Sequence, residues 1–254
     1  MSTDIDSTGW PDGYDRIILD EVDSTMAEAA RRAPSLAGPT WILARRQTAA
    51  RGRRGRAWAN PEGNFAATLV MQPNGPADQA ALRSFVASLA LYDTLRKVVD
   101  ARQLALKWPN DVLLAGGKVA GILLEAQGAG GAADRLSIGI GINLISAPAP
   151  VEVEPGAVPP VALADYSQAK LPAQGVLFEL ACAFAEWETR FGQFGFDPVR
   201  RMWLSKAARL GEVITARTGR EDVTGTFETV DEAGNLILKT AQGRRAIAAA
   251  DIYF

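Results

Sequence analysis

The sequence predicts an α+β protein with one mixed sheet and flanking helices, followed by a small C-terminal β-barrel. Three observations lead to this prediction. Several short segments of the N-terminal half alternate apolar and polar residues, as strands do. Segments with apolar residues at helical spacing lie between and after them. From about Leu210 the pattern changes to short strands separated by turn residues, which is typical of a small antiparallel barrel.

The N-terminal part begins with an alternating strand at residues 14–23, which leads directly into a helix at 24–33. Thr25 and Glu28 have the spacing of a capping box, so we expect them to cap this helix. Further strands are expected at residues 41–46, 65–72, 104–108 and 136–144. Strands that alternate with helices and hairpins in this way favour a mixed sheet.

A β-hairpin is predicted over residues 112–126, with its turn at Gly116 and Gly117. Pro109 ends the strand that precedes this hairpin, because proline has no N–H to donate to a sheet. Residues 146–161 contain five prolines and little periodicity, and we interpret them as an irregular loop.

Helices are predicted at residues 79–99, where one face is apolar, and again at 177–191 and 198–208. The C-terminal strands are expected at residues 212–218, 224–230, 235–240 and 244–250. The predicted organisation is therefore a polar tail over residues 1–15, a main domain over 16–209 and a barrel domain over 210–254.

Composition excludes several kinds of chemistry. The chain contains no histidine, so Ser-His-Asp hydrolysis, Cys-His proteolysis and histidine-ligated zinc are impossible. Its single cysteine, Cys182, excludes a thiolate zinc site, and we expect no metal bound by protein ligands alone. A reaction whose nucleophile is already ionised suits this inventory, since it needs positioning and charge neutralisation rather than a general base.

Charge and cysteine content predict a cytoplasmic protein. The 27 Lys and Arg residues nearly balance 29 Asp and Glu, so no overall positive field favours nucleic acid or a membrane. Cys182 lies in an apolar run, which indicates a buried thiol in a reducing compartment. The N-terminal residues are polar and acidic, unlike an export signal, and no apolar run approaches the roughly 18 residues of a membrane span.

The strongest local signal is the segment RGRRGR at residues 51–56. Four guanidinium groups in six residues repel one another unless an anion lies among them. Glycine allows the backbone to approach a phosphate closely, and guanidinium groups bind its oxygens in pairs. The segment therefore indicates an anion-binding loop, with a solvated basic loop or a nucleic-acid patch as the alternative.

Three further segments attract attention. Lys107 begins the motif KWPND at residues 107–111, where a strand end can hold an ammonium group in a fixed place. Lys118 follows the predicted hairpin turn, where a surface charge is the ordinary explanation. Residues 139–143 alternate glycine with isoleucine, so that one face of the strand has no side chains, which suits either close packing or contact with a ligand.

In this order, the motifs resemble those of the biotin protein ligase family, which includes the bacterial biotin operon repressor. The family's DSTN, GRGRRGR, KWPND and KLAGIL motifs correspond to DSTM at residues 23–26, ARGRRGR at 50–56, KWPND at 107–111 and KVAGIL at 118–123. The resemblance covers residues 17–143 by motif and 210–254 by general character. It implies a catalytic domain like those of class II aminoacyl-tRNA synthetases, with an SH3-like C-terminal barrel.

The resemblance also implies roles for individual residues. The implied biotin-binding residues are Ser24, Thr25, Gln47, Arg51, Lys107, Gly121 and Ile122. The implied ATP- and adenylate-binding residues are Arg51, Arg53, Arg54, Arg56, Trp58, Asn110, Lys118 and Asn143. Lys107 and Arg53 would be catalytic: Lys107 would neutralise charge between the biotin carboxylate and the α-phosphate, and Arg53 would close over the phosphates.

The implied reaction converts biotin and ATP to biotinyl-5′-AMP and pyrophosphate, then transfers biotin to a lysine of a biotin carboxyl carrier protein, such as that of acetyl-CoA carboxylase. Mg²⁺ would enter with ATP. A homodimer is a further candidate assembly. DNA is not an expected partner, because about sixteen residues before the first strand are too few for the helix-turn-helix domain of the family's repressors.

Two positions depart from the family motifs. Ala50 stands where the family has glycine, which would cause strain if the position required a positive φ. Met26 stands where the family has asparagine, so a polar contact there would be lost. Lipoate protein ligase, which has a similar fold and the same adenylate chemistry, is the alternative enzyme, and a nucleic-acid-binding protein is the alternative of another class.

Overall fold

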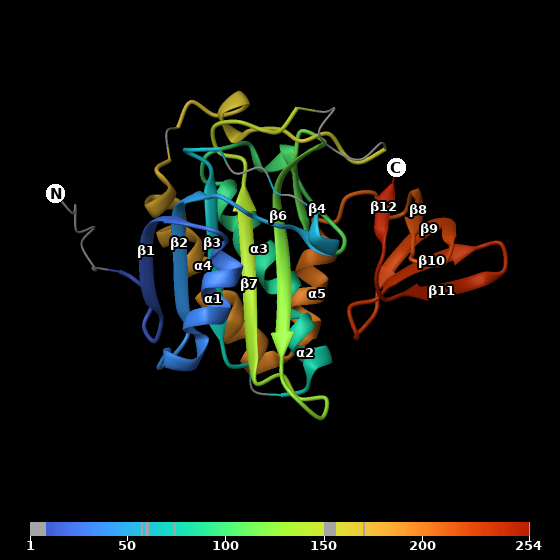
Figure 1. The fold of residues 1–254 in the computed structure, drawn as a ribbon. Coiled ribbons are helices and arrows are strands. Elements are labelled where there is room, and N and C mark those ends of the chain that lie inside the picture. Colours follow the sequence, from blue (N-terminus) through green and yellow to red (C-terminus); the bar gives the residue numbers. More distant parts are fainter. Residues whose placement is uncertain are drawn as a thin grey trace.

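The computed structural model describes residues 9–56, 58, 61–73, 75–149, 156–169 and 171–253. These residues form a seven-stranded mixed sheet with helices on both faces and a five-stranded antiparallel sheet at the C-terminal end (Figure 1). The predicted combination of a mixed, helix-covered sheet with short C-terminal strands is confirmed. Pro150 and Pro155 of the predicted proline-rich loop, most of the N-terminal tail and Asn74 in the turn after residue 72 lie outside the described residues.

The large sheet has the strand order β1-β2-β3-β7-β6-β5-β4. Its strands are β1 (Asp15–Val22), β2 (Thr40–Gln47), β3 (Phe65–Met71), β4 (Leu104–Lys107), β5 (Asp111–Leu114), β6 (Gly117–Gln127) and β7 (Arg135–Ile142). β1 and β2 are parallel, and every other neighbouring pair is antiparallel. Parallel strands need a crossover, and α1 (Thr25–Arg32) supplies it here.

Helices cover both faces of this sheet (Figure 1). On one face, α1 packs over β2, β3 and β7. The other face carries α2 (Ala77–Ala81), α3 (Arg83–Leu95), α4 (Ala173–Phe194) and α5 (Phe196–Leu204). Successive side chains of β2 point to opposite faces of the sheet. Ile42 therefore faces α1, while Trp41 and Leu43 belong to the main core. Short 3₁₀ turns are formed by Ala33–Ser35, Arg53–Gly55, Ala101–Gln103 and Leu163–Asp165.

Several local predictions were wrong. The helix expected at residues 79–99 is two helices that meet at Leu82, and α3 is buried on nearly all sides because it lies between the sheet and α4. The hairpin turns at Ala115 and Gly116, with φ of 49° and 82°, rather than at Gly116 and Gly117. Gly117 instead begins β6, where a Cβ atom would lie 2.3 Å from the side chain of Val161.

The capping box is also absent. Ser24 is the N-cap of α1 and makes no side-chain cap hydrogen bond, and Thr25 is the first helical residue. The Thr25 hydroxyl donates to Gln47 instead, while Glu28 pairs with Arg31 and Arg32. Tertiary contacts therefore replace the local capping interaction.

The C-terminal sheet has the order β11-β10-β9-β8-β12, and all of its pairs are antiparallel. It consists of β8 (Val213–Arg217), β9 (Asp222–Val230), β10 (Leu236–Thr240), β11 (Gly243–Ile247) and β12 (Asp251–Tyr253). The strand expected at residues 244–250 ends at Ile247, and β12 was not predicted. Within the described residues, no ladder joins the outer strands β11 and β12.

The C-terminal sheet packs against the rest of the molecule beside α5 (Figure 1). The indole N–H of Trp108 donates to the carbonyl of Gly234 at 3.0 Å, and Arg200 donates to the carbonyl of Val230 at 3.1 Å. Buried side chains of both parts belong to one continuous core. Among the described residues, no helix has the length and apolar character needed to cross a membrane.

Replacing Phe184 in α4 should destabilise the whole fold. Its ring is fully buried between Trp41 and Tyr14, with ring centroids 5.8 and 6.4 Å away. We expect Phe184→Ala to lower the free energy of unfolding by about 3–5 kcal/mol in urea titrations, because it leaves a cavity. Phe194→Ala, at an exposed position of the same helix, is the control and should change it by less than about 0.5 kcal/mol. Equal effects would contradict the core assignment.

Candidate active site

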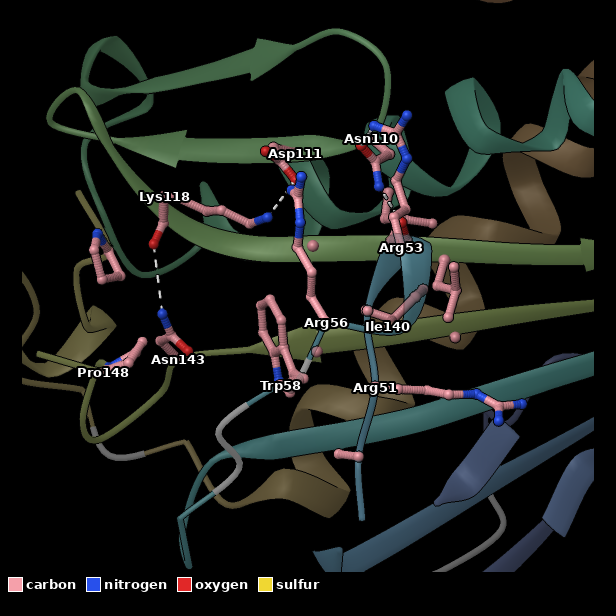
Figure 2. Close-up of a pocket in the computed structure, with 18 of the residues that line it drawn as sticks. Arg51, Arg53, Arg56, Trp58, Asn110, Asp111, Lys118, Ile140, Asn143 and Pro148 are labelled. Atoms are coloured by element: carbon pink, nitrogen blue, oxygen red, sulfur yellow. Dashed lines mark hydrogen bonds and ion pairs between the residues drawn. The ribbon is translucent and has the colours of Figure 1, made fainter. Parts of the chain in front are cut away.

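One cavity of about 630 Å³ gathers almost all of the residues singled out in the sequence (Figure 2). This is a typical size for a small-molecule site, which spans roughly 300–1,000 Å³. The sequence-predicted residues that line it are Ser24, Thr25, Gln47, Arg51, Arg53, Arg56, Trp58, Lys107, Asn110, Lys118, Gly121, Ile122 and Asn143. Arg54 is the exception, since it does not line the cavity.

One end of the cavity carries uncharged polar groups. The side-chain oxygen of Gln47 accepts hydrogen bonds from the backbone N–H of Thr25 at 2.8 Å and from its hydroxyl at 3.1 Å. Thr68 on β3 donates its hydroxyl to the hydroxyl oxygen of Thr25 at 2.9 Å. These contacts join the start of α1 to the end of β2 and the middle of β3, so the polar groups are held in place before any ligand binds.

The wall formed by β6 and β7 is flat because it carries glycine. A Cβ atom at Gly141 would lie 2.6 Å from the Trp58 ring, and one at Gly121 would lie 3.1 Å from it. Trp58 therefore lies directly on the backbone of these paired strands. Beside it, a Cβ atom at Gly139 would lie 2.7 Å from the sulfur of Met26. Met26 thus fills space with its thioether where the family motif has asparagine.

Two lysines share one carboxylate at the ends of β4 and β5. Lys118 lies 2.7 Å from one oxygen of Asp111, and Lys107 lies 3.9 Å from the other, as the close-up shows for Lys118 (Figure 2). Antiparallel pairing of Lys107 with Asp111 places both beside the cavity. Burial lowers the pKa of Lys107, and the neighbouring Asp111 carboxylate opposes that shift. Two cations with one carboxylate leave a net positive charge, which suits an anionic ligand.

The arginine-rich loop contacts the C-terminal sheet. Asp251 lies 2.6 Å from Arg54, 3.0 Å from Arg56 and 3.7 Å from Arg53. Arg53 also donates to the carbonyl of Ala250 at 3.3 and 3.4 Å. Arg54 has a left-handed backbone, with φ of 56° and ψ of 25°, which costs a non-glycine residue about 1–2 kcal/mol. The ion pair at 2.6 Å helps to offset that cost.

Two asparagines hold the strands that carry the site. Asn110 donates to the carbonyl of Ile122 and accepts from Arg53 at 3.3 Å, so it connects the loop with β6. Asn143 donates to the carbonyls of Lys118 and Val161 at 3.4 and 3.2 Å (Figure 2). Its amide therefore positions the backbone around Lys118 while it lines the cavity.

The charges of the cavity are strongly unequal. Its basic lining residues are Arg51, Arg53, Arg56, Lys107 and Lys118, whereas its acidic ones are Asp111 and Asp251. An uncharged polar end and an apolar glycine wall adjoin this positive region. The arrangement suits a ligand with a planar or apolar part and a phosphate group.

Sequence reasoning did not identify several lining residues. Asp111 belongs to the quoted KWPND motif, but no role was assigned to it. Asp251, Ile252 and Tyr253 come from the unpredicted strand β12. No local pattern near Asp251 indicates a site, since its partners in the arginine-rich loop lie almost 200 positions away along the chain. The Ala50 departure causes no strain, because Ala50 is not among the residues with positive φ.

Adding a methyl group to the glycine wall should disturb the site without unfolding the protein. In Gly141→Ala, the new Cβ atom would overlap the Trp58 ring and force it to move. We expect the affinity for ATP, the nucleotide that the family resemblance implies, to fall roughly tenfold or more in calorimetry, because misplacement of a positioning group weakens a preorganised site. Gly192→Ala in α4 meets no atom within 4 Å and is the control. Unchanged affinity in Gly141→Ala would contradict the assigned geometry.

The chain is similar to known proteins over most of its length. Residues 18–143 match the model of the biotin/lipoate A/B protein ligase family, and residues 210–254 match that of the biotin protein ligase C terminal domain. A biotin--[acetyl-CoA-carboxylase] ligase of Paracoccus denitrificans is 52% identical over 238 residues, which cover 93% of this chain and 99% of the relative. A bifunctional ligase/repressor of Bacillus subtilis is 31% identical, with 94% and 74% covered.

Solved structures show the same relationship. A biotin protein ligase from Aquifex aeolicus in complex with biotin and ATP has a TM-score of 0.75 and 26% identity, and the match covers 94% of this chain and 97% of that one. With a relative more than half identical over nearly its whole length, and with both family models matched, the chain belongs to the biotin protein ligase family.

Proposed function

We propose that this pocket performs the two half-reactions of a biotin protein ligase. In the first, a carboxylate oxygen of biotin attacks the α-phosphorus of ATP, and the bond to pyrophosphate breaks. In the second, a lysine amine of a biotin carboxyl carrier protein attacks the acyl carbon of biotinyl-5′-AMP, and AMP leaves. The observation that carries the proposal is Lys107, a buried cation that lines the same cavity as the uncharged polar side chains of Ser24, Thr25 and Gln47 and the arginine-rich loop.

Biotin is assigned to the uncharged end. Its ureido group has donors and acceptors that suit the side chains of Ser24, Thr25 and Gln47, and the wall beside Gly121 and Ile122 accommodates its apolar rings. In this assignment, the biotin carboxylate interacts with Lys107. The ammonium group neutralises negative charge that grows as the carboxylate attacks the phosphate, which is a large contribution in a site with little water.

ATP is assigned to the arginine-rich side. Arg53 and Arg56 line the cavity and can bind phosphate oxygens, with Arg51 at the half-exposed edge. Lys118 lies 5.4 Å from the centre of the Trp58 ring, so a cation and an aromatic face adjoin each other beside Asn110 and Asn143. Arg54 belongs to the same loop, but its side chain does not line the cavity.

Mg²⁺ is proposed to enter with ATP. Within the part of the chain that the structure describes, no group of three or more His, Cys, Asp and Glu side chains is arranged to hold a metal ion. The cavity does offer the carboxylate of Asp111, and Mg²⁺ typically binds one or two carboxylates together with substrate phosphates. The residues present therefore fit an ion held mainly by the phosphates, whose charge it would reduce during attack.

Several wider features remain predictions of this proposal. They are the division into a catalytic domain at 16–209 and a C-terminal domain at 210–254, an SH3-like barrel form of the latter, a fold like class II aminoacyl-tRNA synthetases, a cytoplasmic location and a homodimer. The carrier protein is proposed from the names of the relatives, which are biotin--[acetyl-CoA-carboxylase] ligases. The C-terminal sheet is proposed to help close the site, since Asp251, Ile252 and Tyr253 line the cavity.

A direct assay tests the function. The protein is incubated with ATP, Mg²⁺ and a carrier domain, with labelled biotin and labelled lipoate in parallel. We expect label on the carrier with biotin and background with lipoate. The nucleic-acid alternative is disfavoured because Arg53, Arg54 and Arg56 turn toward Asp251. Transfer of lipoate alone, or sub-micromolar DNA or RNA binding at physiological salt without transfer, would contradict the proposal.

Replacing Lys107 should nearly abolish the first half-reaction. We expect Lys107→Ala to slow pyrophosphate release by a factor that corresponds to about 3–4 kcal/mol, because transition-state charge is no longer neutralised. Lys239→Ala removes an exposed lysine on β10 and serves as the control with the same substitution. Thermal melting should show that both variants are folded. Pyrophosphate release at the wild-type rate in Lys107→Ala would overturn the assignment.

A further inference from the structure

We propose that Asp251 is a positioning residue that tethers the arginine-rich loop to the C-terminal sheet and holds this loop over the pocket. The carboxylate acts as a resident anion for the loop. When a phosphate group binds, it takes over the guanidinium groups that line the cavity, while the tether outside the cavity persists. The inference rests on the proposed function only for the identity of the incoming phosphate.

The geometry of the contact carries this inference. Three arginines of the loop converge on the carboxylate of Asp251. Arg54 and Arg56 lie 2.6 and 3.0 Å from the same oxygen, and Arg53 lies 3.7 Å from the other. The preceding carbonyl, of Ala250, accepts two hydrogen bonds from Arg53. A loop with four arginines in six residues repels itself, and a shared anion removes much of that repulsion.

Asp251 is well placed to remain ionised. Its side chain is 16% exposed, and burial alone would raise the pKa of its carboxyl group. The hydrogen bond from Arg56 and the charges of Arg56, Arg54 and Arg53 outweigh burial and lower that pKa. Charge-assisted hydrogen bonds to a half-buried carboxylate are stronger and less screened than surface ion pairs.

The arginines divide into two groups. Arg53 and Arg56 line the cavity and also contact Asp251, so a phosphate and Asp251 compete for them. Arg54 contacts Asp251 at the shortest distance of the three but does not line the cavity. Its backbone is left-handed, whereas Arg53 and Arg56 have negative φ. Arg54 is therefore the part of the loop that can keep its contact with the C-terminal sheet after nucleotide binds.

Limited proteolysis of the full chain without nucleotide tests the tether directly. Trypsin cuts after arginine, so an open loop offers cleavage sites within residues 51–56, and mass spectrometry identifies them. We expect Asp251→Asn to be cut there roughly tenfold faster than wild type, since cleavage follows the population of the open loop. The control is Glu228→Gln, which removes a carboxylate paired with Arg244 at the far side of the same sheet and should match wild type. Cleavage of Asp251→Asn at the wild-type rate would overturn the proposal.

A second variant keeps the test decisive if Asp251→Asn lowers the melting temperature of the whole protein. Arg54→Ala removes the other side of the tether and leaves the remaining arginines of the loop available to trypsin. We expect faster cleavage at those sites, and a double variant that is cut no faster than Asp251→Asn alone, because the two residues act as a pair. Additive effects, or no effect of Arg54→Ala in a folded protein, would contradict the tether.

A kinetic measurement connects the tether with the proposed reaction. With biotin and ATP, we expect Asp251→Asn to release biotinyl-5′-AMP roughly tenfold faster, with a smaller change in kcat for pyrophosphate release, because the loop no longer closes over the product. If Asp251 had a merely structural role, the substitution would change the release rate of biotinyl-5′-AMP and kcat for pyrophosphate release by similar factors. If wild type makes no adenylate while the proteolysis result holds, the proposed function fails and the tether stands. If adenylate is made but proteolysis is unchanged, the tether fails alone.

Discussion

An excess of positive charge around one pocket is the constraint on which the rest of this structure depends. Lys107 is buried, and burial disfavours its charged form, so a carboxylate must lie close by. Asp111 meets this need for Lys107 and Lys118 together, and Asp251 does so for three arginines. Neutralisation is only partial in both places. The remaining positive charge is what makes the pocket suitable for a substrate carboxylate and phosphates, whose negative charge grows during the reaction.

The large sheet positions these charges with little freedom. Pairing of β4 with β5 sets Lys107 opposite Asp111, and pairing of β5 with β6 sets Asp111 opposite Gly121. Because the register of a sheet with buried faces is strongly specified, the cations cannot shift along the strands. The absence of side chains at Gly121 and Gly141 then allows Trp58 to lie on the sheet itself. Rigid strands thus supply the cations and the flat wall, while the loop supplies the arginines.

The C-terminal sheet belongs to the site as well as to the core. It is joined to the large sheet by buried apolar side chains and by the hydrogen bond from Trp108, the residue next to Lys107. At its other end, Asp251 contacts the arginine-rich loop. One packed unit therefore contacts both sources of positive charge. Through these contacts, the position of the C-terminal sheet can influence the position of the arginine-rich loop.

The sequence by itself determined the class of chemistry and most of the elements. The lack of histidine excluded whole families of mechanism, the alternating segments predicted the strands, and the RGRRGR and KWPND segments located the cations, because each of these signals lies within a few consecutive residues. Only the tertiary structure decided which partners those residues take. Thr25 bonds Gln47 rather than capping its helix, Arg54 turns out of the pocket, and Asp251 joins it from almost 200 positions away. Such contacts depend on how separate elements pack, and local sequence patterns do not predict that packing.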